Sequence, residues 1–301
     1  MYITKYSTQY GKLIIKTIDY QLAKKITLEN HYSKKWNTSF GKINFGIFHK
    51  NKLCGVAVFG NLMNPNSYKS ISDDIEFDNI LELNRMWIDD CLGKNTETMF
   101  ISGCFKYFKM YKPEIKVIQS FADGRLGCGT IYKASNFGYY GFEKSLFFEN
   151  VETNETFHHV PLENTKRPMG FLNKNRLYLD GKMKPFYVKT YRYIYVLNKK
   201  CKIKLKQQPY PEYEKGIILS DYKQPIGILS RLFLMYDAIN DNVYRDKAYK
   251  HIIELGYNEN EIKKKFQHNK KMSPINGLLK SIWIMKTRKS WWKTIKIQKI
   301  T

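Results

Sequence analysis

One carboxylate in this chain stands where a predicted buried strand gives way to a glycine-rich turn. Asp123 follows an apolar run at residues 117–121 that is typical of a buried β-strand, and glycines occupy positions 124, 127 and 129. Thr130 can then cap a short helix. Ligands commonly bind at the carboxyl end of such a strand. The same residues equally fit a plainer role, in which Asp123 caps a turn and the glycines only permit positive φ.

A second candidate site is the start of a predicted helix after Gly93. Apolar residues at helical spacing between Phe100 and Phe108 predict a helix whose aromatic face joins the core. Free backbone N–H groups at a helix N-terminus bind phosphate. Polar residues that could assist them surround this one: Lys94, Asn95, Thr96 and Thr98. Glu97 opposes an anion there, and an ordinary helix cap explains the same residues.

The chain is strongly basic. Its 51 Lys and Arg against 27 Asp and Glu give a formal net charge of +24, and residues 201–301 hold 21 − 9 = +12 of it. A field of this sign attracts polyanions, of which nucleic acid is the commonest. A lysine-rich, AT-biased genome would raise the lysine content without any such partner.

Length and composition indicate a folded protein of one or two domains. Hydrophobic residues make up 43% of the 301 residues, enough to bury a real core. No apolar run is long enough to cross a bilayer, and the first residues do not resemble a signal peptide, so we expect a soluble, intracellular protein. Five cysteines without paired spacing indicate reduced thiols, and six histidines show no metalloprotease pattern.

Strand and helix patterns along the chain must position these residues. Strands are predicted at residues 13–15, 45–48, 53–60, 80–88 and 191–197, and residues 145–148 could pair with 156–160. Asp19 can cap a helix over residues 21–30. We expect a long polar loop at 61–79 and irregular structure at 161–190. Basic and aromatic residues alternate in the strand at 191–197, which fits either nucleic-acid contact or core packing.

The pattern becomes helical after residues 206–211, which are typical of a linker. Helices are predicted at 229–239 and 248–255, and Asn258 with Glu261 would cap a third helix through Phe266. Two short helices about a glycine fit either a DNA-reading helix-turn-helix or an ordinary helical hairpin. The basic tail at 278–300 could lie on DNA phosphates or on an acidic membrane surface.

Four segments of the chain together resemble a known family. They are ENHYSKKW at 29–36, LELNRMWI at 81–88, NTETMFIS at 95–102 and IQSFADGRLGCGTIYKASNF at 118–137. In order and spacing they look like the Mom family of phage DNA-modification proteins. Residues 191–210 are similar to the downstream part of that family, and residues after 212 are not covered.

The resemblance implies a fold like that of GCN5-related N-acetyltransferases (GNAT), which is α+β with a mixed, mostly antiparallel sheet flanked by helices. It implies a catalytic domain at 1–212. The helical patterns and the charge of the remaining residues predict a basic, mainly helical region at 213–301 that could bind DNA. Residues 130–137 are similar to the superfamily segment that ends in Gly-Phe, although Asn136 stands at the glycine position. The superfamily's pyrophosphate loop is missing between Trp87 and Phe100, a departure from a standard acetyl-coenzyme A site.

The function that the resemblance implies is modification of adenine N6 in DNA. A carbamoylmethyl group is added, which protects phage DNA from restriction, in the cytoplasm of the bacterial host. Proposals for the family involve acetyl-coenzyme A, or a related acyl donor, and an iron ion. The implied partner is double-stranded DNA and not a membrane. The oligomeric state stays open, and a dimer is compatible with the sequence.

The resemblance also implies site residues, position by position. His31, Tyr32 and Asp123 match positions implicated in metal binding or catalysis, since imidazole, phenolate and carboxylate are donors that suit iron. Without a metal, Asp123 could accept a proton from the adenine amine, and Tyr132 could act as acid toward a thiol leaving group. The implied donor-binding residues are Leu83, Asn84, Arg85, Asn95, Thr96, Thr98 and Ser102. The implied DNA-binding residues are Lys34, Lys35, Arg125 and Arg192.

Adenine N6 lies in the base stack, so the nucleotide would have to flip into a pocket. Aromatic residues near the motifs could form a stacking wall or simply belong to the core: Tyr32, Trp36, Phe121, Tyr139 and Tyr140. Two other functions stay open. One is acetyl transfer to a protein or small molecule, with the basic surface incidental. The other is non-enzymatic nucleic-acid binding, which leaves the strand-end carboxylate without a use.

Overall fold

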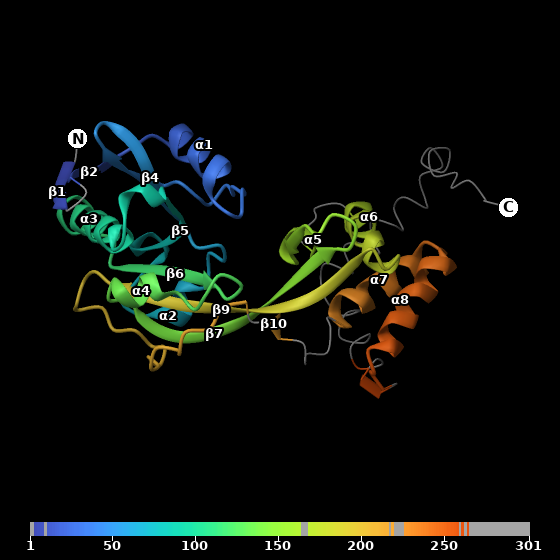
Figure 1. Ribbon diagram of the computed structural model, residues 1–301. Helices are drawn as coiled ribbons and strands as arrows, with labels where there is room; N and C mark the ends of the chain where they lie inside the picture. The colour runs from blue at the N-terminus through green and yellow to red at the C-terminus, as the bar shows by residue number, and fades with distance from the viewer. Residues whose placement is uncertain are drawn as a thin grey trace, which may run out of the picture. The chain divides into compact units, whose positions relative to one another are not determined.

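The computed structural model describes residues 3–8, 11–163, 168–216, 218–219, 226–258, 260–261 and 264 (Figure 1). The chain forms two compact units. Unit 1 comprises Met1–Lys144 and Lys189–Ile217, and unit 2 comprises Ser145–Val188 and Ile218–Thr301. The chain therefore enters unit 2 twice. The first entry was not predicted from the sequence, because the chain enters and leaves unit 2 within two long strands, β7 (Gly138–Asn150) and β9 (Met183–Val196).

Unit 1 is organised around a mixed β-sheet with the strand order β1-β2-β3-β4-β5-β6-β9-β7. Its first six strands are β1 (Ile3–Thr8), β2 (Gly11–Thr17), β3 (Ile43–His49), β4 (Lys52–Gly60), β5 (Ile80–Ile88) and β6 (Val117–Asp123). The pairs from β1 to β5 are antiparallel, as is β6 with β9, whereas β5 and β6 are parallel. With its flanking helices, this sheet confirms the predicted α+β class.

The parallel strands β5 and β6 pair along only a short part of their length, and the site lies where the pairing ends. Ile80 lies opposite Val117, and the register ends with Glu82 opposite Gln119. Both strands continue beyond that point, β5 to Ile88 and β6 to Asp123. The carboxyl ends of two adjacent parallel strands therefore leave room between them, which is where ligands commonly bind in sheets of this kind.

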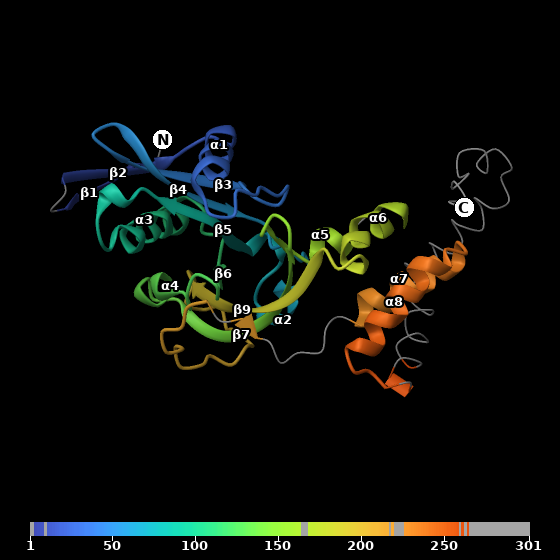
Figure 2. The ribbon, with the colours of Figure 1, turned by 45° about the vertical axis from the view of Figure 1, so that its right-hand side comes forward.

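Helices cover both faces of the unit 1 sheet (Figure 2). α1 (Tyr20–Asn30) begins as predicted, since Oδ1 of Asp19 accepts a hydrogen bond from the Leu22 N–H at 2.9 Å. It shares a hydrophobic cluster with Val58 of β4. α3 (Thr96–Tyr111) packs Phe108 against the next residue of that strand, Phe59, with ring centroids 4.9 Å apart. Successive strand side chains point to opposite faces, so the two helices lie on opposite sides of the sheet.

Short elements complete unit 1. The expected polar loop at 61–79 contains α2 (Tyr68–Ile71) and a 3₁₀ turn, η1 (Phe77–Asn79). A second 3₁₀ turn, η2 (Asp90–Leu92), precedes α3. After β6, the helix α4 (Thr130–Ala134) has Gly129 as its N-cap, so Thr130 is its first residue and does not cap it as predicted.

Unit 2 has its own hydrophobic core, shared between its two chain segments. Besides parts of β7 and β9 it contains β8 (Thr156–His158), α5 (Val160–Glu163), α6 (Pro168–Leu179), β10 (Ile218–Leu219), α7 (Ile226–Ala238) and α8 (Asn242–Glu254). The predicted pairing of 145–148 with 156–160 is confirmed, with Phe147 opposite His158. The prediction of irregular structure at 161–190 was wrong, because α6 and the start of β9 lie there. Pro168 suggested a break, but proline is well tolerated in the first turn of a helix.

The predicted helices at 229–239 and 248–255 are present, in longer form, as α7 and α8. The capping box after them is confirmed: the Asn258 N–H donates to Glu261 Oε2 at 3.0 Å, and the Glu261 N–H donates to Asn258 Oδ1 at 2.9 Å. Most of the helix expected through Phe266, and the tail at 278–300, lie outside the described residues. Among the helices that the structure describes, none combines the length and apolar character that crossing a membrane requires.

Candidate active site

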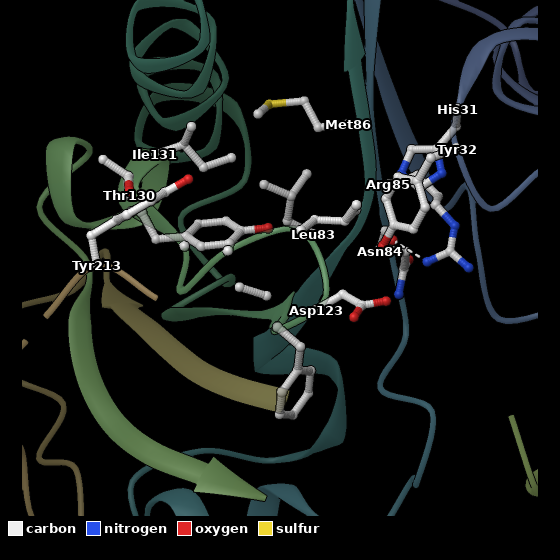
Figure 3. A pocket seen from close by; sticks show the side chains of 16 residues that line it. His31, Tyr32, Leu83, Asn84, Arg85, Met86, Asp123, Thr130, Ile131 and Tyr213 are labelled. Carbon is white, nitrogen blue, oxygen red and sulfur yellow. Dashed lines mark hydrogen bonds between the residues drawn. The ribbon is translucent and has the colours of Figure 1, made fainter. Parts of the chain in front are cut away.

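A cavity of about 380 Å³ opens in unit 1 at the carboxyl ends of β5 and β6 (Figure 3). Residues 31–32 after α1, 83–86 of β5 and 121–123 of β6 line it, together with 126–127, 129–132 and Tyr213. The four residues that the motifs assign to catalysis, His31, Tyr32, Asp123 and Tyr132, all face this space. So do three of the implied donor-binding residues, at positions 83, 84 and 85.

Asp123 ends β6 beside this cavity, with its side chain 13% exposed. The Arg125 guanidinium contacts both carboxylate oxygens, with Nη2 2.5 Å from Oδ2 and Nε 3.0 Å from Oδ1. The backbone N–H of Arg125 also donates to Oδ1 at 3.0 Å. The carboxylate therefore closes a turn, as the plainer interpretation predicts, and it also lines a cavity.

His31 is the C-cap residue of α1 and is 6% exposed. Its Nδ1 accepts a hydrogen bond from the Ser33 N–H at 3.1 Å and lies 2.9 Å from Ser33 Oγ. Because an amide N–H can only donate, the neutral ring carries its proton on Nε2. Burial, followed by the positive charge of Arg85, lowers the pKa of His31 to about 4. The imidazole is therefore uncharged at neutral pH.

Tyr32 lies against this imidazole, with ring centroids 4.3 Å apart and ring planes inclined by 33°. Unlike His31, it is largely exposed, with 58% of its surface open to solvent. Loss of solvent around the hydroxyl, followed by the negative charge of Asp123, raises the pKa of Tyr32. The tyrosine therefore keeps its proton at neutral pH and presents an aromatic ring with one side backed by His31.

Tyr132 of α4 also lines the cavity and is buried. Its hydroxyl lies 2.8 Å from Ser120 Oγ, which in turn lies 3.0 Å from the Leu83 carbonyl oxygen. The Ser120 hydroxyl has one proton, and it donates that proton to the Leu83 carbonyl oxygen, because a carbonyl can only accept. The Tyr132 hydroxyl therefore donates to Ser120 Oγ when both hydrogen bonds are present. Burial raises the pKa of Tyr132 to about 12. Ser120 thereby links β5, β6 and α4 at the point where the two strands separate.

Arg85 brings a second guanidinium to the cavity. Its Nη1 donates to the Asn84 carbonyl oxygen at 2.6 Å, and its guanidinium carbon lies 4.6 Å from the centroid of the Phe40 ring. The Nε of Arg85 is buried and finds no hydrogen-bond partner among the described residues. Glu82, earlier in the same strand, is buried. It accepts hydrogen bonds from Asn84 Nδ2 at 3.1 Å and Gln119 Nε2 at 3.3 Å.

A second cavity of about 290 Å³ lies in unit 1 between α3 and α4. Two of the implied donor-binding residues, Thr98 and Ser102, line it together with Lys106 and Lys109. Ser135 also lines it, is 7% exposed, and has an Oγ without a hydrogen-bond partner in the described part of the chain. An unpaired buried hydroxyl is costly unless a ligand or water completes it. This cavity is therefore suited to a polar, anionic ligand.

The other two implied donor-binding residues at the start of α3, Asn95 and Thr96, line neither cavity. Thr96 is buried, and its Oγ1 is hydrogen-bonded to the Leu92 carbonyl oxygen at 2.8 Å. Asn95 adopts a left-handed conformation, with φ of 66°, and its side chain does not cap the helix. The expectation that their side chains bind a donor finds no support in this arrangement, because Thr96 is already used to hold the turn before α3.

Residues 12–212 match the sequence model of the Mom protein family. This chain belongs to the Mom family. The methylcarbamoylase Mom of Escherichia phage Mu is 34% identical to it over 215 residues, which cover 67% of this chain and 86% of the phage protein. The family membership expected from the four motifs is thereby confirmed.

Solved structures with some similarity to this Mom-family chain are acetyltransferases. The ribosomal-protein-S5-alanine acetyltransferase from Vibrio fischeri is 9% identical, with 65% of this chain and 98% of that chain covered and a TM-score of 0.37. An N-acetyltransferase from Staphylococcus aureus Mu50 is 13% identical, with 62% and 97% covered and a TM-score of 0.34. A likeness of this degree carries no argument about the present chain, whose fold class rests on its own strand order.

The iron ion suggested for Mom proteins does not fit these residues as they are arranged. Metal ligands must be deprotonated and have a free lone pair. His31 uses Nδ1 for Ser33 and carries its proton on Nε2, and the raised pKa of Tyr32 opposes a phenolate, so Asp123 is left as the one ready donor of the three. Among the described residues, no group of three or more His, Cys, Asp and Glu side chains is placed to hold a metal ion. We therefore assign no step to iron.

The four residues implied to bind DNA in this Mom chain fall into different environments. Lys34 and Lys35 are exposed and follow Tyr32 closely along the chain. Arg125 is next to the cavity and is engaged with Asp123. Arg192 is the most covered of the four: its side chain is 17% exposed, pairs with the exposed carboxylate of Glu143 and lies 5.5 Å from the Phe121 ring centroid. A contact with DNA would have to compete with this ion pair.

Two residues of the site were missed from the sequence. Tyr213 lines the cavity and is 70% exposed, and an aromatic residue in the proline-rich segment after residue 206 was the available signal. Ser120 was missed because a serine inside an apolar strand gives no sign of its partner. Of the suggested stacking wall, Tyr32 and Phe121 line the cavity. Trp36, Tyr139 and Tyr140 do not, and instead join hydrophobic clusters.

Proposed function

We propose that this Mom-family chain modifies the exocyclic N6 of adenine in duplex DNA, at the cavity beside Asp123. The observation that carries the proposal is an oriented carboxylate at the end of β6, in a cavity that also exposes the Tyr32 ring. The cavity volume falls in the range of about 300–1,000 Å³ that is usual for ligand sites. The family relative from phage Mu, named a methylcarbamoylase, supports this class of reaction.

The chemistry demands a base near N6, because the amine lone pair is delocalised into the purine ring. As the new N–C bond forms, N6 must lose a proton, and Asp123 is the carboxylate positioned to accept it. Each carboxylate oxygen has two lone pairs, so hydrogen bonds from Arg125 leave acceptor capacity toward the cavity. The neutral ring of His31 supports Tyr32, on which a flipped purine would stack.

An acyl thioester, such as an acyl-coenzyme A, would supply an activated carbon to this site. The second cavity fits the anionic arm of such a donor, because Lys106 and Lys109 supply positive charge and Ser102 and Ser135 supply hydroxyls. Tyr132, with a pKa of about 12, retains its proton at neutral pH, so it can donate a hydrogen bond to a leaving thiolate only by giving up Ser120. Attack of N6 on the thioester carbonyl forms the N–C bond, breaks the C–S bond and releases the thiolate, so the product of this step is an N6-acyl adenine. The carbamoylmethyl group expected for the family, which protects DNA from restriction, needs an N6–CH₂ bond and an amide nitrogen that a thioester alone does not supply.

The test is incubation of the purified protein with duplex DNA and acyl-coenzyme A donors, followed by mass spectrometry of the released nucleosides. Deoxyadenosine heavier by one acyl group is the result that acyl transfer predicts. A carbamoylmethyl adduct would keep the site and mean that the donor is not a simple acyl thioester. Donor turnover that is equal with and without DNA would point to acetyl transfer to another substrate. Binding of DNA with unmodified adenine under every donor condition would contradict the enzymatic proposal.

A further inference from the structure

The mouth of the Asp123 cavity carries three large side chains that remain open to solvent. Tyr32 is 58% exposed, Leu126 50% and Tyr213 70%. The two tyrosines have π-faces on which a base can stack. Leu126 has none and offers no hydrogen bond, so it contributes to ligand binding only by occupying apolar space. An aliphatic side chain half exposed beside a polar cavity therefore needs a different explanation from its aromatic neighbours.

The turn that carries Leu126 is held firmly from several directions. The Gly124 N–H donates to the Lys189 carbonyl oxygen, and the Gly124 carbonyl accepts from the Gly216 N–H, both at 2.9 Å. A side chain at position 124 would place its Cβ 2.5 Å from the Lys189 carbonyl oxygen, so the turn lies directly on β9. The Leu126 N–H donates to the Asp123 carbonyl oxygen at 2.9 Å. Leu126 is thus held at the rim, although burial of its side chain would be favourable.

The residue next to Leu126 suits a DNA backbone. The guanidinium of Arg125 is 25% exposed, and arginine contacts phosphates through several donors. A flipped base leaves a gap in the stack, and apolar side chains of DNA-binding proteins commonly insert between bases and unstack them. A rigid turn that ends in an arginine and a leucine, beside a cavity able to take a base, has the parts that this step requires.

We propose that Leu126 enters the base stack of duplex DNA and occupies the space that the flipped adenine leaves. The inference rests on the proposed function, because it assumes that adenine in DNA is the substrate. It assigns to Leu126 a positioning role, distinct from the chemistry at Asp123: it stabilises the extrahelical nucleotide and touches no reacting atom. Single-stranded DNA has no stack to fill, so its modification does not need this side chain.

The test compares Leu126→Ala with the wild type on plasmid duplex and on single-stranded DNA of the same sequence, with modified adenosine measured by mass spectrometry. We expect a loss of about 10- to 100-fold on the duplex, as loss of a contribution of a few kcal/mol to flipping implies, and a change within about twofold on the single strand. Leu126→Met, which keeps an apolar chain, should restore most of the duplex activity. Met110→Ala is the matched control, because Met110 of α3 is 65% exposed and lines neither cavity.

Equal losses on the two substrates, or full duplex activity in Leu126→Ala, would overturn the role of Leu126 and leave the proposed function standing. Modification of single strands alone by the wild type would overturn both the role of Leu126 and the duplex substrate of the proposed function. If the wild type modifies neither substrate, the proposed function fails, and this inference fails with it.

Discussion

At the scale of single residues, Asp123 combines two roles that usually belong to different side chains. Its Oδ1 accepts the N–H that closes the turn, and both of its oxygens contact the Arg125 guanidinium. The arginine keeps the carboxylate in one orientation beside the cavity. Because the arginine occupies acceptor positions on both oxygens, it also competes with the transfer of a substrate proton to the carboxylate. In the function proposed here, proton transfer to Asp123 depends on the lone pairs that Arg125 leaves open, or on movement of Arg125 toward a DNA phosphate.

His31 makes the stability of the protein depend on pH in a defined direction. Its pKa is lowered from the ordinary value of 6.5 to about 4, so the unfolded chain binds the proton more readily between these values. Folding is therefore favoured at pH 7 and weakened as the pH falls through that window, by about 3 kcal/mol in total. Urea unfolding of the wild type and of His31→Gln, repeated from pH 7 to pH 4.5, should show a steeper loss of stability in the wild type than in the variant.

If the free energies of unfolding of wild type and His31→Gln differ by a constant amount across the whole range, the histidine is not buried in its neutral form.

His31 and Tyr32 were assigned through the resemblance to the Mom family, which the segment at 29–36 helps to carry. Asp123 was found because a buried strand, a carboxylate and a glycine-rich turn form a distinctive local pattern. Tyr213 was not found, because its place at the cavity depends on the path taken after β9, far along the chain from Asp123. Arg192 was taken as a DNA contact because positive charge can be read from a sequence, whereas its pairing with Glu143 cannot.

At the scale of elements, the early end of the β5–β6 register creates the site, and Gly129 keeps α4 close to it. Gly129 has φ of +89°, and a Cβ there would lie 2.6 Å from Tyr193 Cε2 and 3.0 Å from Tyr132 Cδ2. Gly129→Ala therefore adds a steric clash to backbone strain, and we expect a loss of about 3 kcal/mol or more in the free energy of unfolding. Urea unfolding gives this value directly.

Gly216→Ala separates the two causes, because Gly216 also has positive φ, +73°, but its Cβ would meet nothing within 4 Å. That variant should lose only about 1 kcal/mol. Equal losses in the two variants would mean that the packing of Tyr132 and Tyr193 around Gly129 is looser than described.

Most elements of unit 1 could be predicted because their patterns are strong. The strand at 80–88 coincides with β5, and Asp19 caps α1 as expected. Unit 2 was harder, since Pro168 and Gly170 look like breakers although they fall in the first turn of α6. The entry of residues 145–188 into unit 2 gives no local signal either, because two continuous strands carry the chain there and back.

At the scale of the whole molecule, the excess of positive charge is the property that the cavity does not explain. Residues 265–301 contain ten Lys and Arg and no Asp or Glu. Contacts between such residues and phosphates release counterions, so the affinity for DNA should fall steeply with salt. Between 50 and 200 mM salt we expect the full chain to lose at least about 10³-fold in affinity for duplex DNA, measured by fluorescence anisotropy. A chain that ends at Lys264 should bind more weakly at low salt and show a shallower slope.

An unchanged salt slope in the shortened chain would place the phosphate contacts elsewhere, and the basic residues near the cavity, Lys34 and Lys35, would then be the next to replace. Weak binding with little dependence on salt in the full chain would mean that the charge does not serve DNA at all.

The most direct test of the central claim is mass spectrometry of adenosine from host DNA after expression of the wild type, Asp123→Asn and Asp78→Asn. Asp78 is a matched control, since it is an exposed carboxylate of unit 1 that pairs with Lys42. We predict modified adenosine with the wild type and with Asp78→Asn, and a loss of at least about 100-fold in Asp123→Asn at equal amounts of folded protein. Modified adenosine at wild-type levels in Asp123→Asn would contradict the assignment of this cavity as the site where adenine is modified.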